Sequence, residues 1–284
     1  MNKAQLDIIQ QLQETSDEAL NALQQALPAA NKQLAAELGE FLYSLDKTSS
    51  GKIKPTIANL KKVDGFRKVL NKVTDGQLYN AAVGAFISQF SRVSKLMDLY
   101  FVTVTASYSV KPLYEAVRQA NIDTTVASLL GSGLDANLKD PVIRLLKQNI
   151  AGGSDSRALR SLLEADILGT PTINPTLTRY VKQVSSDSLY QFEANYLQVV
   201  SNDLGLQHYY YQGTTIGDSR IFCVQRAGKY FRADEVKEWA ELSWSGRIKG
   251  TNASNILTNR GGYGCRHLII PVSKELYEQK TKGK

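Results

Sequence analysis

The sequence predicts a mainly α-helical protein with a helical N-terminal body and a small α+β C-terminal module. Through most of the first 200 residues, apolar residues recur at three- and four-residue steps, the spacing of amphipathic helices. After Gly205 the pattern changes to short aromatic and β-branched runs separated by glycine, which is typical of strands. Hydrophobic residues make up 43% of the 284 residues, so the chain can bury a core.

The first 50 residues predict a pair of helices. Apolar spacing indicates a helix over residues 2–27, which Pro28 is expected to end. A second helix is expected from about Asn31, rich in Gln, Ala and Glu. Its apolar face is Leu34, Leu38, Phe41 and Leu45. Two long helices whose faces opposite the apolar side are polar are more typical of an assembly element than of an enzyme pocket.

The middle of the chain predicts further helices. Residues 47–55 are expected to form a loop, and Pro112 is expected to open a helix. From Leu99 to Val110 the pattern fits a strand or a continuing buried helix, and periodicity does not decide. A long helix is expected from about Thr176 to Asp203, ended by Gly205. The other expected helices are 56–72, 77–99, 112–120, 123–130, 141–150 and 155–168, the last capped by Ser154 or Asp155.

The last 80 residues predict the α+β module. Strands are expected in QHYYYQG, DSRIFCVQ and KYF, and a short helix in ADEVKEWAEL. Residues 243–262 are expected to be mostly loop, and HLIIPVS a strand that Pro271 ends. The predicted domains are a helical arm (1–50), a helical body (51–170), and a long helix with the module (171–284).

The net charge of +7 is unevenly distributed along the chain. Residues 51–118 carry eleven basic and four acidic side chains, and residues 218–284 carry thirteen and seven. Two basic blocks suit an acidic partner such as nucleic acid, or form a well-solvated surface. The N-terminus lacks a secretion signal, and the longest apolar stretch is too short and too polar to span a bilayer, so no membrane segment is expected.

All cysteine and histidine residues lie in the predicted module, at His208, Cys223, Cys265 and His267. Two Cys and two His can make a tetrahedral zinc site, but the usual C-x2-C and H-x3-H spacings are missing. We therefore predict buried cysteines with no metal and no other cofactor. If a metal were bound, its candidate ligands would be Cys223, Cys265 and His267.

Catalysis by a thiol requires an imidazole within hydrogen-bond reach of the sulfur. Cys265 and His267 are too close in sequence to be expected to pair, which leaves Cys223 with His267 and no third orienting residue. The phosphate-loop, dinucleotide, hydrolase and zinc-protease motifs are also missing from the sequence. The sequence therefore predicts a protein that is not an enzyme.

Basic and aromatic residues alternate in the module, a mixture that suits contact with phosphates. Alternatively, the aromatic side chains form the small core and the arginines bind loop carbonyls and carboxylates. The candidates for contact with DNA or an acidic surface are Arg226, Lys229, Arg232, Arg247, Lys249 and Arg260.

Residues 176–273 contain an ordered series: a long helix, a D-x-R and Cys element, and a Gly-Cys-Arg-His element before a strand with proline. The positions of the two elements are Asp218, Arg220, Cys223, Gly264, Cys265, Arg266 and His267. In this ordered combination the segment resembles the C-terminal module of Mu-F-like minor head proteins of tailed phages.

The chain departs from this family at two positions. Arg226 lies near the place of a second Cys found in many members, and Tyr263 and Gly264 precede Cys265 where many members have a His. These departures weaken a zinc site carried over from the family. They leave a structural role, in which Asp218, Arg220 and Arg266 hold the loops by charged hydrogen bonds.

The resemblance implies a minor structural virion protein at the portal or neck, or inside the head. Its expected role is in head assembly, genome packaging or delivery, and its expected location is the virion, assembled in the host cytoplasm. The expected partners are portal or other head and neck proteins, in several copies around the portal vertex, and packaged DNA, but not a membrane. The alternatives are an internal DNA-binding virion protein, or an effector enzyme built on the C-terminal module.

Overall fold

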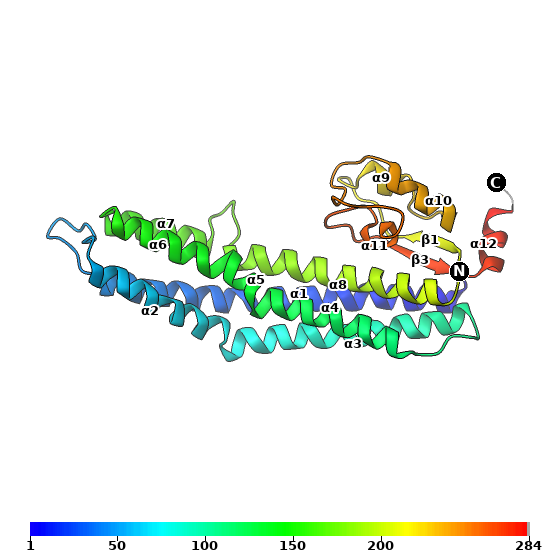
Figure 1. Cartoon of the computed structure of the whole chain (residues 1–284), viewed down its shortest axis with the longest axis horizontal. Coiled ribbons are helices and arrows are strands. Elements are labelled where there is room, and N and C mark those ends of the chain that lie inside the picture. The colour runs from blue at the N-terminus through cyan, green and yellow to red at the C-terminus, as the bar shows by residue number, and fades with distance from the viewer. Residues whose placement is uncertain (283–284) are drawn as a thin grey trace. The chain divides into compact units, whose positions relative to one another are not determined.

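The computed structural model describes residues 1–282 and is mainly α-helical, with a small antiparallel sheet near the C-terminus (Figure 1). This confirms the predicted fold class. The chain divides into two compact units. Unit 1 consists of Met1–Glu18, Ser88–Ile122 and Ser186–Lys284, and unit 2 of Ala19–Ile87 and Asp123–Ser185.

These units differ from the predicted consecutive segments 1–50, 51–170 and 171–284. Each unit is built from pieces that are distant in sequence, because four long helices contribute residues to both. These helices are α1 (Lys3–Ser44), α3 (Gln77–Val104), α4 (Pro112–Leu130) and α8 (Thr176–Asp203).

Unit 2 is entirely helical apart from its loops and isolated bridges. The Thr56 side chain caps α2 (Ile57–Thr74) by accepting a hydrogen bond from the Asn59 backbone amide. Asp155 caps a later helix, as predicted, by accepting from the amides of Arg157 and Ala158. Besides its parts of the long helices, unit 2 contains α2 (Ile57–Thr74), α5 (Ser132–Leu134), a π-helical turn (Asp135–Lys139), α6 (Asp140–Ala151) and α7 (Ser156–Leu168).

Helix α1 passes through Pro28, so the prediction that Pro28 ends a helix is wrong. The reason is that the apolar face keeps its phase across the proline. Leu27 and Leu34, on either side of Pro28, are buried, whereas Pro28 itself is exposed. Burial of this continuous face outweighs the hydrogen bond that proline cannot donate.

Two other helices are longer than the sequence predicted. Helix α3 continues to Val104, which decides the open assignment of residues 99–110 in favour of helix for its first part. Helix α4 runs unbroken from Pro112 to Leu130 and joins the two helices that were predicted separately.

The helical part of unit 1 is held together by buried aromatic rings. Phe90 on α3 lies 5.0 Å from Phe192 on α8, centroid to centroid. Tyr114 on α4 meets Tyr196 on α8 edge to face at 5.9 Å. Helix α8 therefore packs against α3 and α4 through these rings.

The C-terminal module contains a three-stranded antiparallel sheet in the order β2-β1-β3. Its strands are β1 (His208–Gln212), β2 (Tyr230–Arg232) and β3 (Leu268–Val272). Pro271 was predicted to end the last strand but lies inside β3, opposite Tyr209. A proline is tolerated there because β3 is an edge strand. The Pro271 carbonyl accepts a hydrogen bond from the Tyr100 hydroxyl at 2.8 Å, which joins the sheet to α3.

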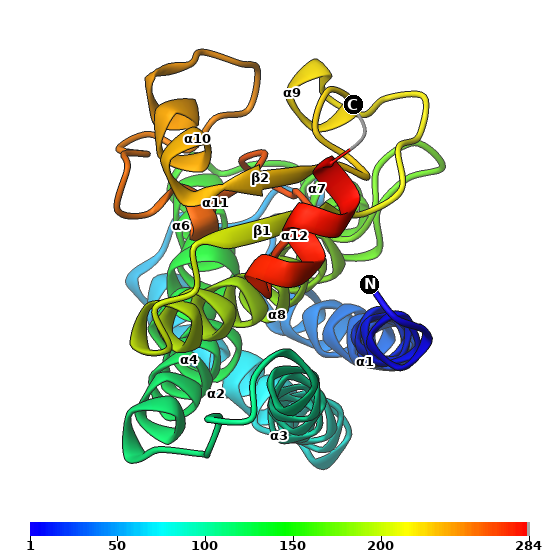
Figure 2. The same ribbon diagram turned by 90° about the vertical axis from the view of Figure 1, so that its right-hand side faces the viewer.

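The stretch DSRIFCVQ was predicted as a strand but forms a short helix, α9 (Ile221–Val224). It buries the adjacent residues Phe222 and Cys223, which a strand would place on opposite faces. Both sides of the central strand β1 are already occupied by β2 and β3. The remaining elements are α10 (Ala233–Glu238), a 3₁₀ turn (Trp239–Glu241), α11 (Ile256–Asn259) and α12 (Lys274–Thr281), which lies beside β1 and β2 (Figure 2).

Candidate functional site

The loops of the C-terminal module, together with α1 and α8, line an open cavity of about 730 Å³ in unit 1. Its wall is formed by the segment from β1 to α9, Ser245 in the loop before α11, the loop before β3, and the helices α1 and α8. The cavity is lined by Gln13, Asp17, Tyr190, Gly213, Thr214, Ile216, Asp218, Ser219, Arg220, Cys223, Ser245, Gly264, Cys265, Arg266 and His267.

This lining includes all seven residues on which the family resemblance depends. Three come from the segment 218–223 and four from the segment 264–267. Segments about 40 residues apart in sequence therefore meet around one cavity. The ordered series that carries the resemblance corresponds to a single place in the fold.

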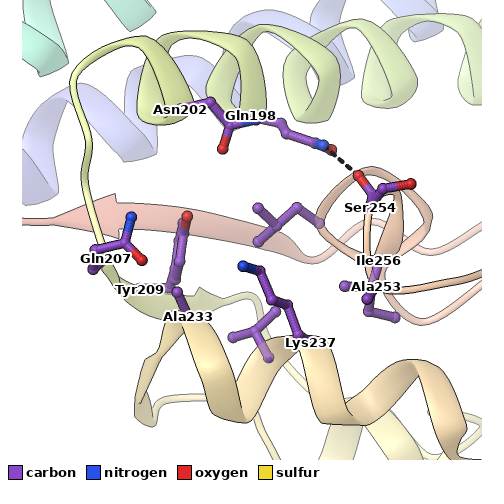
Figure 3. A pocket seen from close by; sticks show the side chains of 11 residues that line it. Gln198, Asn202, Gln207, Tyr209, Ala233, Lys237, Ala253, Ser254 and Ile256 are labelled. Carbon is purple, nitrogen blue, oxygen red and sulfur yellow. Dashed lines mark hydrogen bonds between the residues drawn. The ribbon is translucent and has the colours of Figure 1, made fainter.

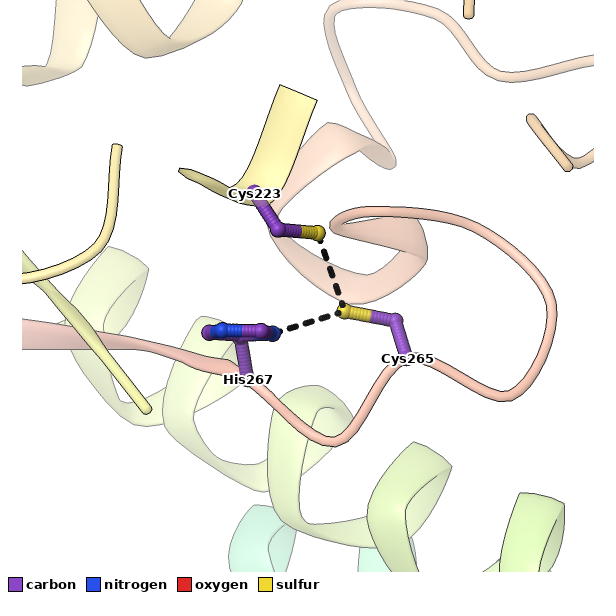
Figure 4. Close-up of side chains that lie close together, drawn as sticks. All are labelled: Cys223, Cys265 and His267. Carbon is purple, nitrogen blue, oxygen red and sulfur yellow. Dashed lines mark hydrogen bonds between the residues drawn. The ribbon is translucent and has the colours of Figure 1, made fainter. Parts of the chain in front are cut away.

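Cys223, Cys265 and His267 form a compact cluster at this cavity (Figure 4). The two sulfur atoms are 4.0 Å apart, and Nδ1 of His267 lies 3.7 Å from the Cys265 sulfur. The side chains are 3%, 5% and 8% exposed, in that order, and both cysteines are free thiols. The sequence-based argument that Cys265 and His267 are too close to meet is wrong, because the loop directs both side chains to the same side.

The two thiols influence each other's protonation. The hydrogen bond from the Cys223 thiol lowers the pKa of Cys265, and the hydrogen bond with His267 and the charge of Arg260 act in the same direction. The same hydrogen bond to Cys265, together with burial, raises the pKa of Cys223. The pair therefore favours a thiolate on Cys265 and a protonated thiol on Cys223.

Glycines leave the space that the cluster occupies. A Cβ atom at Gly261 would overlap the Cys223 sulfur and lie 2.8 Å from the Cys265 sulfur. A Cβ atom at Gly213 would overlap the His267 ring, and Gly213 also has a φ of 144°. Larger side chains at either position would displace the cluster.

The charged residues of the predicted signature act in different ways. Arg220 donates a hydrogen bond to the Tyr263 carbonyl at 2.6 Å and so ties the two loops together, as predicted. Arg266 is exposed and forms an ion pair at 3.8 Å with Asp17 on α1. Asp218 is exposed, and within residues 1–282 its carboxylate makes no hydrogen bond or ion pair, contrary to its predicted role.

Two of the residues predicted to contact DNA or an acidic surface are buried. Arg226 lies with its guanidinium 3.9 Å from the Phe222 ring centroid and donates to the Phe222 carbonyl. Arg260 donates to the Thr258 and His267 carbonyls. The prediction of a surface contact is wrong for both, because these arginines bind loop carbonyls inside the module.

The other four predicted contact residues are more accessible. Arg247 is half-buried and donates to the Ala240 and Thr251 carbonyls. Arg232 is exposed but paired with Asp234 at 2.8 Å. Lys229 and Lys249 are exposed.

Sequence reasoning missed a buried carboxylate near the cavity, Glu193 on α8. It is fully buried, and one of its oxygens accepts a hydrogen bond from the Ser16 hydroxyl of α1. Burial raises its pKa to about 7. The available signal was its position next to Phe192 on the predicted apolar face of the long helix.

A second, smaller pocket of about 220 Å³ lies among α8, β1, α10 and α11 in the same unit (Figure 3). Gln198 crosses part of it and donates to the Ser254 carbonyl at 2.6 Å. This pocket contains none of the predicted site residues. It is lined by Gln198, Asn202, Gln207, Tyr209, Ala233, Val236, Lys237, Ala253, Ser254, Ile256 and Leu257.

No family model, curated protein or solved structure matches this chain. Among residues 1–282, no helix has the length and apolar character needed to cross a membrane. The resemblance to Mu-F-like minor head proteins therefore stays a prediction from the residues themselves. The site is defined by its geometry: a cavity with two cysteines and one histidine at its wall.

Proposed function

We propose that this chain is a minor structural protein of a tailed-phage virion, at the portal or neck or inside the head, acting in head assembly, genome packaging or delivery. The observation that supports the proposal is the convergence of all seven signature residues on one cavity. The segments 218–223 and 264–267 are about 40 residues apart and meet at this cavity, as the two halves of one functional element would.

The proposed partners are portal or other head and neck proteins. The helices of both units expose some large apolar side chains, which suit docking on another protein. Ile57 and Tyr43 in unit 2 are 73% and 87% exposed, and Val102 in unit 1 is 59% exposed.

The proposal is tested on purified particles of the phage or prophage that encodes the chain. We expect mass spectrometry to find the chain in virions at a constant low ratio to the portal protein. Osmotic shock followed by nuclease treatment then separates two locations. A chain bound at the portal stays with the emptied heads, whereas an internal DNA-binding protein leaves with the genome.

Loss of the gene provides the functional half of the test. We expect a stop codon early in the gene to lower the yield of infectious particles, and a plasmid copy of the wild-type gene to restore it. Absence of the chain from purified virions, or normal infectivity without the gene, would contradict the proposal.

The structure offers less support for the DNA-binding alternative, because Arg226 and Arg260 bind carbonyls within the module. The enzyme alternative has one supporting feature, the 3.7 Å approach of Cys265 to His267. Within the described residues, no carboxylate or amide side chain hydrogen-bonds the other ring nitrogen of His267, so the third member of a catalytic triad is missing.

A further inference from the structure

We propose that Cys223, Cys265 and His267 bind a zinc ion through two thiolates and one imidazole, with the fourth position open to the cavity. The three ligand atoms all lie within 4.8 Å of one another. Two sulfurs and one imidazole nitrogen are ligands that zinc prefers. The inference goes beyond the proposed virion function and does not depend on it.

The distances between the ligand atoms fit a tetrahedral zinc site. Zinc–sulfur bonds of about 2.3 Å and zinc–nitrogen bonds of about 2.0 Å place two sulfurs roughly 3.8 Å apart, and a sulfur and a nitrogen roughly 3.5 Å apart. The structure has 4.0 Å between the sulfurs and 3.7 Å between the Cys265 sulfur and the His267 nitrogen. The third pair, the Cys223 sulfur and the His267 ring nitrogen, lies within 4.8 Å, so side-chain shifts of about 1 Å complete the coordination.

A disulfide explains this geometry less well. A sulfur–sulfur bond is about 2.05 Å long, so the two cysteines would have to approach each other by about 2 Å. A disulfide also gives no reason for a histidine beside the pair. His267 is 8% exposed, and its Nδ1 faces the Cys265 sulfur at 3.7 Å. This is the ring nitrogen that metal binding would use.

Neighbouring groups hold the ligand side chains in place. The Tyr211 hydroxyl donates to the Cys223 sulfur at 3.4 Å, and Arg260 donates to the His267 carbonyl at 3.3 Å. Gly261 and Gly213 provide the room that the sulfurs and the ring occupy. Such surrounding contacts orient the ligands of metal sites and contribute to their affinity.

The bound ion would connect two parts of the module that are distant in sequence. Cys223 lies on α9, and Cys265 and His267 lie before β3, 42 residues further along for the cysteine. The two thiolates balance the charge of a Zn²⁺ ion, so the site stays neutral when buried. Because the unfolded chain does not hold these ligands together, metal binding stabilises the folded module. The cavity gives a solvent molecule or another small ligand access to the fourth position.

The first experiment uses the full chain, reduced and without a histidine tag, and zinc or cobalt alone as the probe. We expect elemental analysis after dialysis to find about one zinc ion per chain. Cobalt should give the thiolate charge-transfer absorption and the visible bands of a tetrahedral site, and added zinc should abolish them. This measurement needs no variant, so a folding defect cannot obscure it.

Variants then identify the ligands. We expect Cys265→Ser and His267→Asn each to weaken zinc binding at least about tenfold, since even supporting residues of metal sites have effects of that size. The matched control is His208→Asn, because His208 is the other histidine and packs against the Tyr277 ring, away from the cluster. The control should bind zinc like the wild type.

Two results would overturn the proposal. One is substoichiometric metal with no cobalt–thiolate absorption in a reduced and folded chain. The other is a chain isolated without reductant that is lighter by two hydrogen atoms, with Cys223 and Cys265 in one cross-linked peptide and no metal. Neither result bears on whether the chain is present in virions, so the two proposals fail separately.

Discussion

Glu193 combines complete burial with an incompletely satisfied carboxylate. One oxygen accepts a hydrogen bond from Ser16, and the other has no partner within the described residues. Burial raises the pKa of this group to about 7, while the hydrogen bond from Ser16 and the charge of Arg260 lower it. The folded chain therefore keeps a proton on Glu193 at pH values where the unfolded chain has released it.

This difference predicts how stability depends on pH. Between about pH 4.5 and 7 the folded state binds one more proton at Glu193 than the unfolded state, so this group lowers the free energy of unfolding as pH rises. The total effect is about 3 kcal/mol and is constant above pH 7. We expect Glu193→Gln to remove it, so that the variant gains stability relative to the wild type between pH 5 and pH 8.

Urea unfolding at the two pH values, followed by tryptophan fluorescence, measures this gain. Both tryptophans of the chain, Trp239 and Trp244, lie in the same unit as Glu193. Glu238→Gln, which replaces an exposed carboxylate, is the control and should follow the wild type. Parallel pH profiles for Glu193→Gln and the wild type would show that Glu193 is ionised throughout.

A methyl group at Gly261 has no room, because it would overlap the Cys223 sulfur. We expect Gly261→Ala to lower the free energy of unfolding of unit 1 by about 1–3 kcal/mol through overpacking. Gly217→Ala is the matched control, since a Cβ atom there meets nothing within 4 Å and neither glycine needs a positive φ. Chemical denaturation of both variants measures the difference, and equal stability would mean that the cluster can shift without cost.

Pro28 interrupts the backbone hydrogen bonding of α1 in the middle of the helix. It is exposed in α1 and cannot donate a hydrogen bond to the Gln24 carbonyl. We expect Pro28→Ala to raise the stability of unit 2 by roughly 1–3 kcal/mol, measured as a higher midpoint in far-UV circular dichroism. The exposed neighbour Ala29→Ser should change stability by less than about 0.5 kcal/mol. A less stable Pro28→Ala variant would mean that the proline ring itself supports the fold.

The sequence predicts an element well when its apolar residues repeat at helical spacing over a long stretch. Helix α8 was expected from Thr176 to Asp203 and has these bounds, because its buried face repeats without interruption and Gly205 follows it. Short elements such as α9 were predicted less well. A pattern of four residues is too short to distinguish a strand from a helical turn. The segment forms a helix partly because both edges of β1 are already paired, with β2 and β3.

The candidate site could be predicted only in part. The sequence shows Cys265 and His267 together, and the resemblance adds Cys223 and the charged residues. The sequence does not show that Asp17 on α1 and Tyr190 on α8 line the same cavity, because this depends on how helices distant in sequence pack together. Nor does it show that Arg226 and Arg260 turn inward, because arginines that bind buried carbonyls have the same sequence pattern as arginines that bind phosphate.

The net charge of the chain suggests nucleic-acid binding more strongly than the placement of its basic side chains does. Six phosphate contacts by the predicted residues would give a slope of log K against log salt of about −5. Two of the six are buried, Arg232 is paired with Asp234, and Arg247 binds carbonyls. Lys229 and Lys249 stay exposed, so we expect a slope of only about −2 for duplex DNA.

Fluorescence anisotropy with a labelled duplex, titrated at several salt concentrations, measures this slope. Lys229→Ala combined with Lys249→Ala should remove most of the remaining salt dependence, whereas Lys61→Ala with Lys68→Ala, at positions outside the module, tests the other basic block. If the module variant brings the slope close to zero, the module contacts DNA only through these two lysines, and docking on protein remains its main proposed role. A slope near −5 that neither pair changes would require the buried arginines to turn outward, and would favour the DNA-binding alternative.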